Sequence, residues 1–172
     1  MIWLRRWEMS EHRWVVNASP IISLANIEQA HILPNSCDRM IIPQAVEQEI
    51  LDGPDDDLAK QWIKTTGQRW VQDTGPVVPL VAAWDLGPGE SAVLSWSFLH
   101  PEYQSVVDDL AARKFAKAFG IALCGTIGVI VVAKKAGVIP FVGPLLTRLI
   151  DVDFRIDDRL CQTALRLAGE TK

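Results

Sequence analysis

The sequence has few of the residues on which several classes of protein depend. Among its 172 residues there are three cysteines and three histidines, which form no CxxC pair and no HExxH motif. The pattern therefore indicates neither a disulfide framework nor a zinc site. Basic residues are also limited, since 17 Lys and Arg against 21 Asp and Glu leave a net charge of −4. This balance excludes a general cationic surface, so any contact with nucleic acid must be local.

Long apolar runs are missing as well. The longest, residues 118–133, is interrupted by glycines and is shorter than the roughly 20 residues that cross a bilayer. Charges at Arg5, Arg6 and Glu8 break up the first apolar stretch, which predicts no secretion signal and no membrane association. Together with the scattered cysteines, this favours a cytoplasmic protein.

The length predicts one domain, because domains average about 150 residues. We expect an N-terminal extension over residues 1–13 and a single domain over residues 14–172. Within it, short β-branched runs alternate with amphipathic stretches, as in α/β folds. The runs predict strands near residues 14–17, 40–42, 105–107 and 121–124, with a further edge strand within 68–71. Helices are predicted over residues 21–30, 43–51, 55–66, 91–99, 110–119, 127–136, 144–150 and 158–168, with Ser19 and Thr126 as N-caps.

Strands that alternate with helices should pair in parallel, so their carboxyl ends share one edge of the sheet, where ligands bind in open α/β folds. That edge collects Asn17, Asp108 and Asp109 directly, and Glu49 and Glu90 lie on helices that can lean over it. Carboxylates held close together repel one another unless a divalent cation neutralises them. Oxygen ligands favour Mg²⁺ or Mn²⁺ over zinc or copper.

Each of these acids also has an ordinary structural interpretation. Glu49 alone fits a solvated helix face, Asp109 fits the N-cap of the following helix, and Glu90 fits a first helical turn. Their shared position at one edge of the sheet favours a joint site. Trp84 and Trp96 are interpreted as core or dimer-surface residues, with stacking on unpaired bases as the alternative.

Five blocks of sequence, in order, resemble the PIN domain. This is a Mg²⁺- or Mn²⁺-dependent nuclease fold that includes the toxin ribonucleases of prokaryotic toxin–antitoxin pairs. The resemblance spans residues 14–155, and its blocks are VVNASPII at 15–22, IPQAVEQEI at 42–50, GPGESA at 87–92, DDLAAR at 108–113, and GTIG at 125–128 followed by AKKAG at 133–137.

The resemblance implies a three-layer α/β/α fold with a central parallel sheet of about four to five strands. It also implies an endoribonuclease whose Mg²⁺ or Mn²⁺ is held by Glu49, Glu90 and Asp108. Asn17 and Asp109 complete the catalytic set. Ser19, Arg113, Lys114 and Lys117 are expected to contact the substrate, although the three cations also fit an exposed helix face. The implied partners are single-stranded RNA, an antitoxin protein and a second copy of the chain.

One position departs from the family pattern. Where the family has an aspartate after the first strand, this chain has Asn17, which keeps a carbonyl oxygen but loses the negative charge. One charge acting on a divalent ion at about 4 Å is worth about 8 kcal/mol before desolvation, at an effective dielectric constant of about 20. Metal affinity should therefore fall. The alternative function is a catalytically degenerate module that binds nucleic acid or another protein.

Overall fold

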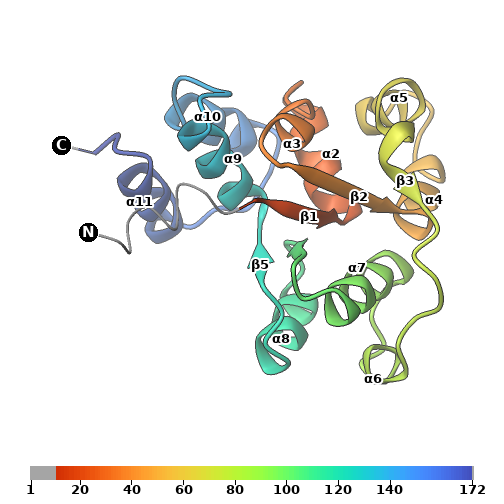
Figure 1. Ribbon diagram of the computed structural model, residues 1–172. Helices are drawn as coiled ribbons and strands as arrows, with labels where there is room; N and C mark the ends of the chain where they lie inside the picture. The colour runs from red at the N-terminus through yellow and green to blue at the C-terminus, as the bar shows by residue number, and fades with distance from the viewer. Residues whose placement is uncertain (1–10, 172) are drawn as a thin grey trace.

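The computed structural model describes residues 11–171 and places five strands in one sheet (Figure 1). The strand order is β3-β2-β1-β4-β5, and every neighbouring pair is parallel, as predicted. In the centre, Val15 lies opposite Ile41 on one side and Ser105 on the other. The strands are β1 (Arg13–Val16), β2 (Arg39–Pro43), β3 (Val71–Gln72), β4 (Gln104–Val106) and β5 (Leu123–Cys124).

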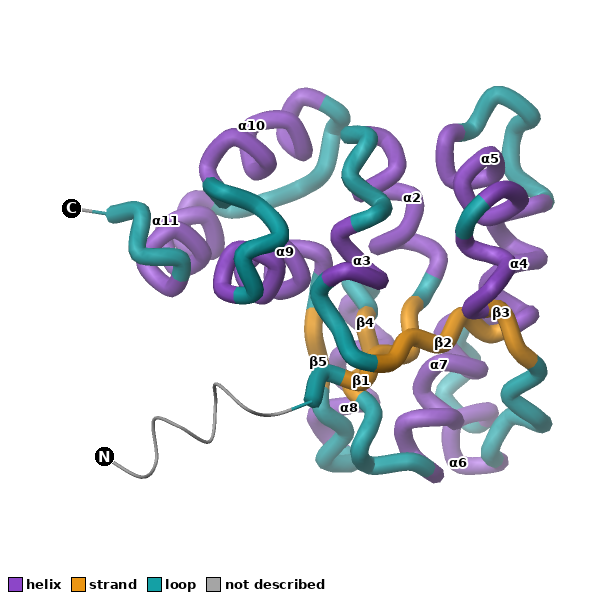
Figure 2. The backbone as a smooth tube through the Cα atoms, turned by 45° about the horizontal axis from the view of Figure 1, so that its top comes forward, coloured by secondary structure: helices purple, strands orange, loops and turns teal. Residues whose placement is uncertain are grey.

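Helices cover both faces of the sheet and give the three layers of an α/β/α fold (Figure 2). One face carries α2 (Ala18–Asn26), α3 (Ile32–Asn35), α4 (Gln44–Leu51), α5 (Leu58–Thr65), α9 (Thr126–Lys135) and α10 (Gly143–Asp151). The other face carries α6 (Pro79–Ala82), α7 (Pro88–Leu99) and α8 (Leu110–Ala118). The short helix η1 (Gly67–Trp70) leads into β3, and α11 (Asp158–Leu167) packs against α9. Among residues 11–171, no helix has the length and apolar character needed to cross a membrane.

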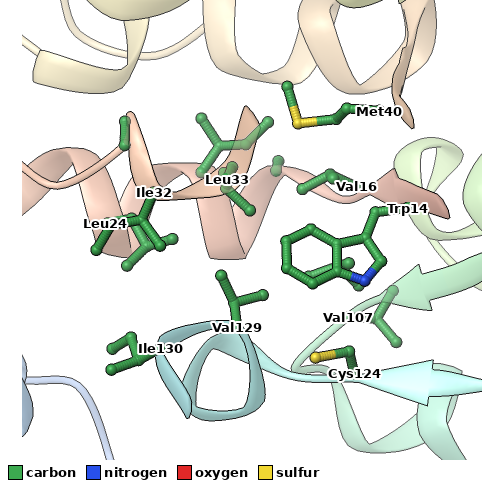
Figure 3. Packing of buried hydrophobic residues seen from close by; sticks show 14 of the residues in the cluster. Trp14, Val16, Leu24, Ile32, Leu33, Met40, Val107, Cys124, Val129 and Ile130 are labelled. Carbon is green, nitrogen blue, oxygen red and sulfur yellow. The ribbon is translucent and has the colours of Figure 1, made fainter. Parts of the chain in front are cut away.

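The core is built on β1, whose last three residues are fully buried because helices cover the sheet on both sides. Trp14 belongs to the same buried cluster as Val129 and Cys124 (Figure 3). Its indole Nε1 donates to Oε1 of Gln104 at 2.9 Å, and Nε2 of Gln104 donates to the carbonyl of Leu123 at 2.8 Å. A buried polar atom is thereby satisfied. The same relay of hydrogen bonds ties β1 to β4 and β5.

The structure corrects several predicted helix starts. The first helix begins at Ala18 and ends at Asn26, so Ser19 is its second residue and not its N-cap. Asn17 holds the N-cap position without a side-chain capping bond, because its amide is used elsewhere. Thr126, also predicted as a cap, is the first residue of α9. The prediction placed the start of α7 at Ser91, but the helix starts at Pro88, since proline is favoured at the first helical position.

Other differences concern short elements. The expected edge strand at residues 68–71 is mostly the helix η1, and only Val71 and Gln72 form β3. Two four-residue helices, α3 and α6, were not predicted because one turn leaves no hydrophobic periodicity to read. The predicted N-terminal extension overlaps β1 at Arg13, and residues 1–10 lie outside the described residues.

Candidate active site at the carboxyl edge of the sheet

Asn17 links the end of β1 to the first turn of α7. Its backbone N–H donates to the carbonyl of Val106 at 3.0 Å, which continues the pairing of β1 with β4. Its side chain is only 1% exposed. The side-chain nitrogen Nδ2 donates to Oε1 of Glu90 at 2.9 Å. This bond fixes the Glu90 carboxylate over the carboxyl end of the central strand.

Glu49 reaches the same place from the last turn of α4. Its Oε1 accepts a hydrogen bond from the backbone N–H of Gly89 at 2.8 Å. Gly89 is the second residue of α7, so its N–H has no partner within the helix, and the helix dipole favours an anion there. In Figure 1 the arrowheads of β1 and β2 point toward α4, which begins directly after β2. The fold therefore brings Glu49 to the edge where Asn17 lies.

The glycines at positions 87 and 89 leave room for this convergence. A Cβ atom on Gly89 would lie 2.7 Å from Oε2 of Glu49 and 2.9 Å from Oδ1 of Asn17. A Cβ atom on Gly87 would overlap Oε2 of Glu90 and lie 3.9 Å from Oε1 of Glu49. Both carboxylates and the amide thus lie against two glycines that have no side chains to occupy the space.

The amide oxygen of Asn17 is the exception to the bonding at this edge. Among residues 11–171, nothing donates a hydrogen bond to this buried atom. An unsatisfied buried acceptor costs about 1–3 kcal/mol, and the neighbouring Oε2 of Glu49 is a second acceptor. Two acceptors that face a common space need a hydrogen-bond donor or a cation between them. As metal ligands, these carboxylate and amide oxygens fit a hard cation such as Mg²⁺ or Mn²⁺.

Asp108 lies at the same edge, but its carboxylate is engaged by the start of α9. Oδ1 accepts from the backbone N–H of Thr126 at 2.8 Å, and Oδ2 accepts from the Thr126 hydroxyl at 2.6 Å. A Cβ atom on Gly125 would lie 3.0 Å from Oδ1 of Asp108 and 3.2 Å from Nη1 of Arg113. The same Nη1 donates to the carbonyl of Val107 at 3.1 Å. A carboxylate and a guanidinium therefore both lie next to Gly125 at the end of β4.

The remaining predicted residues have simpler surroundings. Asp109 is exposed, and its Oδ1 accepts from the backbone N–H of Ala112 at 2.8 Å, so it is the N-cap of α8. Ser19 is exposed in the first turn of α2. Lys114 and Lys117 are exposed on α8. The roles of these residues in substrate contact stay predictions.

The thiols of Cys124 and Cys37 are not suited to act as nucleophiles. Burial raises the pKa of Cys124 to about 12, and the charge of nearby Asp108 acts in the same direction. Burial also raises the pKa of Cys37 to about 12. Both thiols are therefore protonated at neutral pH and are poor nucleophiles.

Three of the predicted residues come together, and the others do not join them. Asn17, Glu49 and Glu90 surround the backbone of residues 87–89, whereas the oxygens of Asp108 are bound by Thr126. Within residues 11–171, no three His, Cys, Asp or Glu side chains are grouped so that they could hold a metal ion. At the carboxyl edge of the sheet, the third side chain beside Glu49 and Glu90 is that of Asn17, an amide, which is not one of these four residue types. A metal ion shared by Glu49, Glu90 and Asp108 stays a prediction.

Two residues important to the geometry were missed as members of the site. Thr126 was predicted only as a helix cap, although it holds both oxygens of Asp108. Gly89 was interpreted only as part of a turn, although its N–H holds Glu49. The available signals were a threonine after a strand and glycines directly before Glu90, and neither identifies a bonding partner.

A parallel sheet covered on both faces, with acidic side chains at its carboxyl edge, defines an α/β protein with a candidate ligand site at that edge. A family model described as a PIN domain matches residues 13–170. The chain therefore belongs to the PIN-domain family and has its nuclease-like fold. A search of the curated proteins and a search of the solved structures each found no match.

Replacement of Thr126 by Val tests how Asp108 is held. Thr126→Val keeps the shape and the backbone N–H but removes the hydroxyl, so we expect a loss of about 1–3 kcal/mol in the free energy of unfolding, measured with urea. Thr126→Ser keeps the hydroxyl and is the matched control. Equal stability of the Val variant and the wild type would show that the hydroxyl bond contributes nothing.

The cap at Asp109 gives a second test. Asp109→Ala removes the acceptor for the N–H of Ala112, and we expect it to lower the free energy of unfolding by about 1 kcal/mol. Asp109→Ser should restore most of this, because serine also caps helices. The measurement is thermal or urea unfolding. A Ser variant as unstable as the Ala variant would rule out capping as the reason for an aspartate here.

Proposed function

We propose that this protein is a divalent-metal-dependent nuclease that hydrolyses phosphodiester bonds of RNA at the carboxyl edge of its sheet. The observation that carries the proposal is the buried Oδ1 of Asn17, which has no donor among the described residues and lies beside Oε2 of Glu49. Membership of the PIN-domain family supports the same chemistry.

Glu49, Glu90 and the amide oxygen of Asn17 would hold the metal ion. A bound Mg²⁺ or Mn²⁺ supplies positive charge that polarises the scissile phosphate and lowers the pKa of a water molecule. The chain itself orients the ligands, because Gly89 N–H fixes Glu49 and Asn17 Nδ2 fixes Glu90. Asp108 adds negative charge at the same edge, held in one orientation by Thr126.

The cations of α8 would bind the substrate backbone. Arg113 lies beside Asp108, and Lys114 and Lys117 follow on the exposed side of the helix. Lys and Arg commonly contact phosphate oxygens and position a strand without reading its sequence. Because the net charge of the chain is −4, this local group is where attraction for a polyanion would be concentrated.

A second candidate function is a degenerate PIN-like module that binds nucleic acid or another protein without cutting. The supporting observation is the bond from Asn17 Nδ2 to Glu90. An amide N–H satisfies a carboxylate oxygen that would otherwise need a cation or water. An aspartate at position 17 has no such donor, so Asn17 would both weaken metal binding and satisfy this oxygen of Glu90 without a cation.

Metal affinity tests the proposed position of the metal ion without any substrate. In calorimetric titrations with Mn²⁺, Asn17→Asp should bind at least about tenfold more tightly than the wild type, since it restores a charge at a buried position beside Glu49. Glu90→Gln should bind more weakly than the wild type. An Asp variant that binds Mn²⁺ no more tightly would contradict the placement of the metal at Asn17.

Cleavage is the second measurement. Incubated with mixed single-stranded RNA and Mn²⁺, the wild type should cut slowly, Asn17→Asp should cut faster, and Glu90→Gln should not cut. Cleavage by the Asp variant alone would support the degenerate module. If none of the three cuts and none binds Mn²⁺, the nuclease proposal is wrong.

A further inference from the structure

The strand β2 has an open edge along its first half. On one side, Arg39, Met40 and Ile41 pair with β1. On the other side, β3 pairs only with Ile42 and Pro43, and Figure 1 shows it beside the arrowhead of β2. Among residues 11–171, no strand therefore pairs with residues 39–41 on the side away from β1. Such an edge is a template for pairing with another extended chain.

The backbone groups of Met40 face this open side. The N–H of Arg39 donates to the carbonyl of His12, which continues the pairing with β1. Successive residues of a strand turn their backbone groups to opposite sides, so those of Met40 point away from β1. Backbone N–H and C=O groups are nearly always paired in folded proteins. An extended peptide supplies both a donor and an acceptor at this spacing.

A groove with aromatic walls follows the open edge. Its volume is about 530 Å³, and its lining includes residues 39–41 together with Trp70, Trp96 and Tyr103. The rings of Trp96 and Tyr103 pack edge to face, with centroids 5.8 Å apart and planes at 84°. The indole N–H of Trp96 is buried and has no acceptor within the described part of the chain. A strand edge beside aromatic rings fits a peptide with large apolar side chains.

The described chain begins at the end of this groove. The backbone N–H of His12 donates to Oδ2 of Asp38 at 2.7 Å, and the N–H of Asp38 donates to the carbonyl of His12 at 2.8 Å. Asp38 is one of the residues that line the groove. Glu11 therefore lies beside the start of β2, and ten further residues with the sequence MIWLRRWEMS precede it.

Ten residues are long enough to reach the open edge. Neighbouring strands lie about 4.8 Å apart, so the position beyond β2 is about 10 Å from β1. Pairing with residues 39–41 needs about 10 Å more along the edge. An extended chain covers about 3.3 Å per residue, so about six residues span both distances. A chain that leaves β1 backwards and turns round the start of β2 runs antiparallel to β2.

The sequence of these ten residues matches an aromatic groove. Trp3 and Trp7 are four positions apart. In an extended chain, side chains at this spacing point to the same side, about 13 Å apart. Tryptophan buries a large area and packs edge to face with other aromatic rings. Both indoles can therefore face the wall that carries Trp96 and Tyr103.

We propose that residues 1–10 of this chain add an antiparallel strand to β2 at residues 39–41, with Trp3 and Trp7 in the aromatic groove. A tethered segment has an effective concentration in the millimolar range, so it competes successfully with the same segment of a second copy. The added strand closes the open edge and protects it from pairing with other chains. This proposal is independent of metal binding and of nuclease activity.

Hydrogen exchange of the full chain, followed residue by residue by NMR, tests the added strand. The amide of Met40 should exchange at least about tenfold faster in Trp3→Ala/Trp7→Ala than in the wild type, because the variant loses the contacts that hold the strand. The amides of Arg39 and Ile41, which face β1, should change little and serve as an internal reference. Trp3→Phe/Trp7→Phe keeps both rings and should exchange like the wild type.

A matched control addresses the loss of exposed apolar surface. Leu160→Ala changes an apolar side chain that is 42% exposed on α11, and it should leave the exchange of Met40 unchanged. Circular dichroism identifies a double variant that fails to fold, and Trp7→Ala alone then replaces it. Equal exchange of Met40 in the wild type and in a folded variant would contradict the proposal.

A synthetic peptide with the sequence of residues 1–10 tests the identity of the occupant. In fluorescence anisotropy, the labelled peptide should bind Trp3→Ala/Trp7→Ala at least about tenfold more tightly than the wild type, whose own segment fills the groove. The same peptide with alanine at both tryptophan positions should not bind. Lack of binding to the double variant, or equal binding to both proteins, would refute the assignment. So would a wild-type dimer in sedimentation that the double variant dissociates, since the segment would then lie in the groove of a second copy.

Discussion

The amide of Asn17 is bonded at one end and unpaired at the other, and the arrangement of the acidic edge depends on this asymmetry. Nδ2 donates to Glu90, while Oδ1 is buried beside an oxygen of Glu49 without a donor among the described residues. An aspartate at this position would repel both carboxylates. The neutral amide instead holds one of them and leaves an acceptor that only a cation or water can satisfy. An asparagine in place of an aspartate at position 17 therefore satisfies one oxygen of Glu90 without a cation and leaves the space in which the proposed metal ion would fit.

This arrangement follows from the fold more than from local sequence. Asn17 stands at the N-cap position of α2, where an asparagine side chain would normally bond to the helix. It turns away because the strand β1 is buried on both faces, and the end of that strand faces the first turn of α7. The long-range contact with Glu90 replaces the local cap. The preference of asparagine for capping a helix is thus overridden by the hydrogen bond to Glu90, which joins the sheet to α7.

Residue patterns predicted the parts of the structure that depend on burial. The apolar runs that contain Val15, Ile41 and Val106 gave the three central strands, and their alternation with helices gave the parallel pairing. The edge where Asn17 and Glu49 meet follows from that topology. The hydrogen bonds from Thr126 to Asp108 do not follow from the topology, because the rotation of the Asp108 side chain toward Thr126 depends on the packing of α9. The exposure of Trp84 was equally unpredictable, since α6 is a single turn and its neighbour α8 is distant in sequence.

The first turns of two helices stabilise carboxylates of the acidic edge with backbone hydrogen bonds. The N–H of Gly89 in α7 binds Glu49, and the N–H of Thr126 in α9 binds Asp108. Helix N-termini stabilise anions through unpaired N–H groups and the helix dipole. The carboxylates are therefore partly compensated by the backbone, independently of any cation, and the edge can fold with its acids close together. A metal ion that binds here must compete with these N–H groups for carboxylate oxygens. With an amide in place of one carboxylate, that competition favours weak binding of the proposed metal ion.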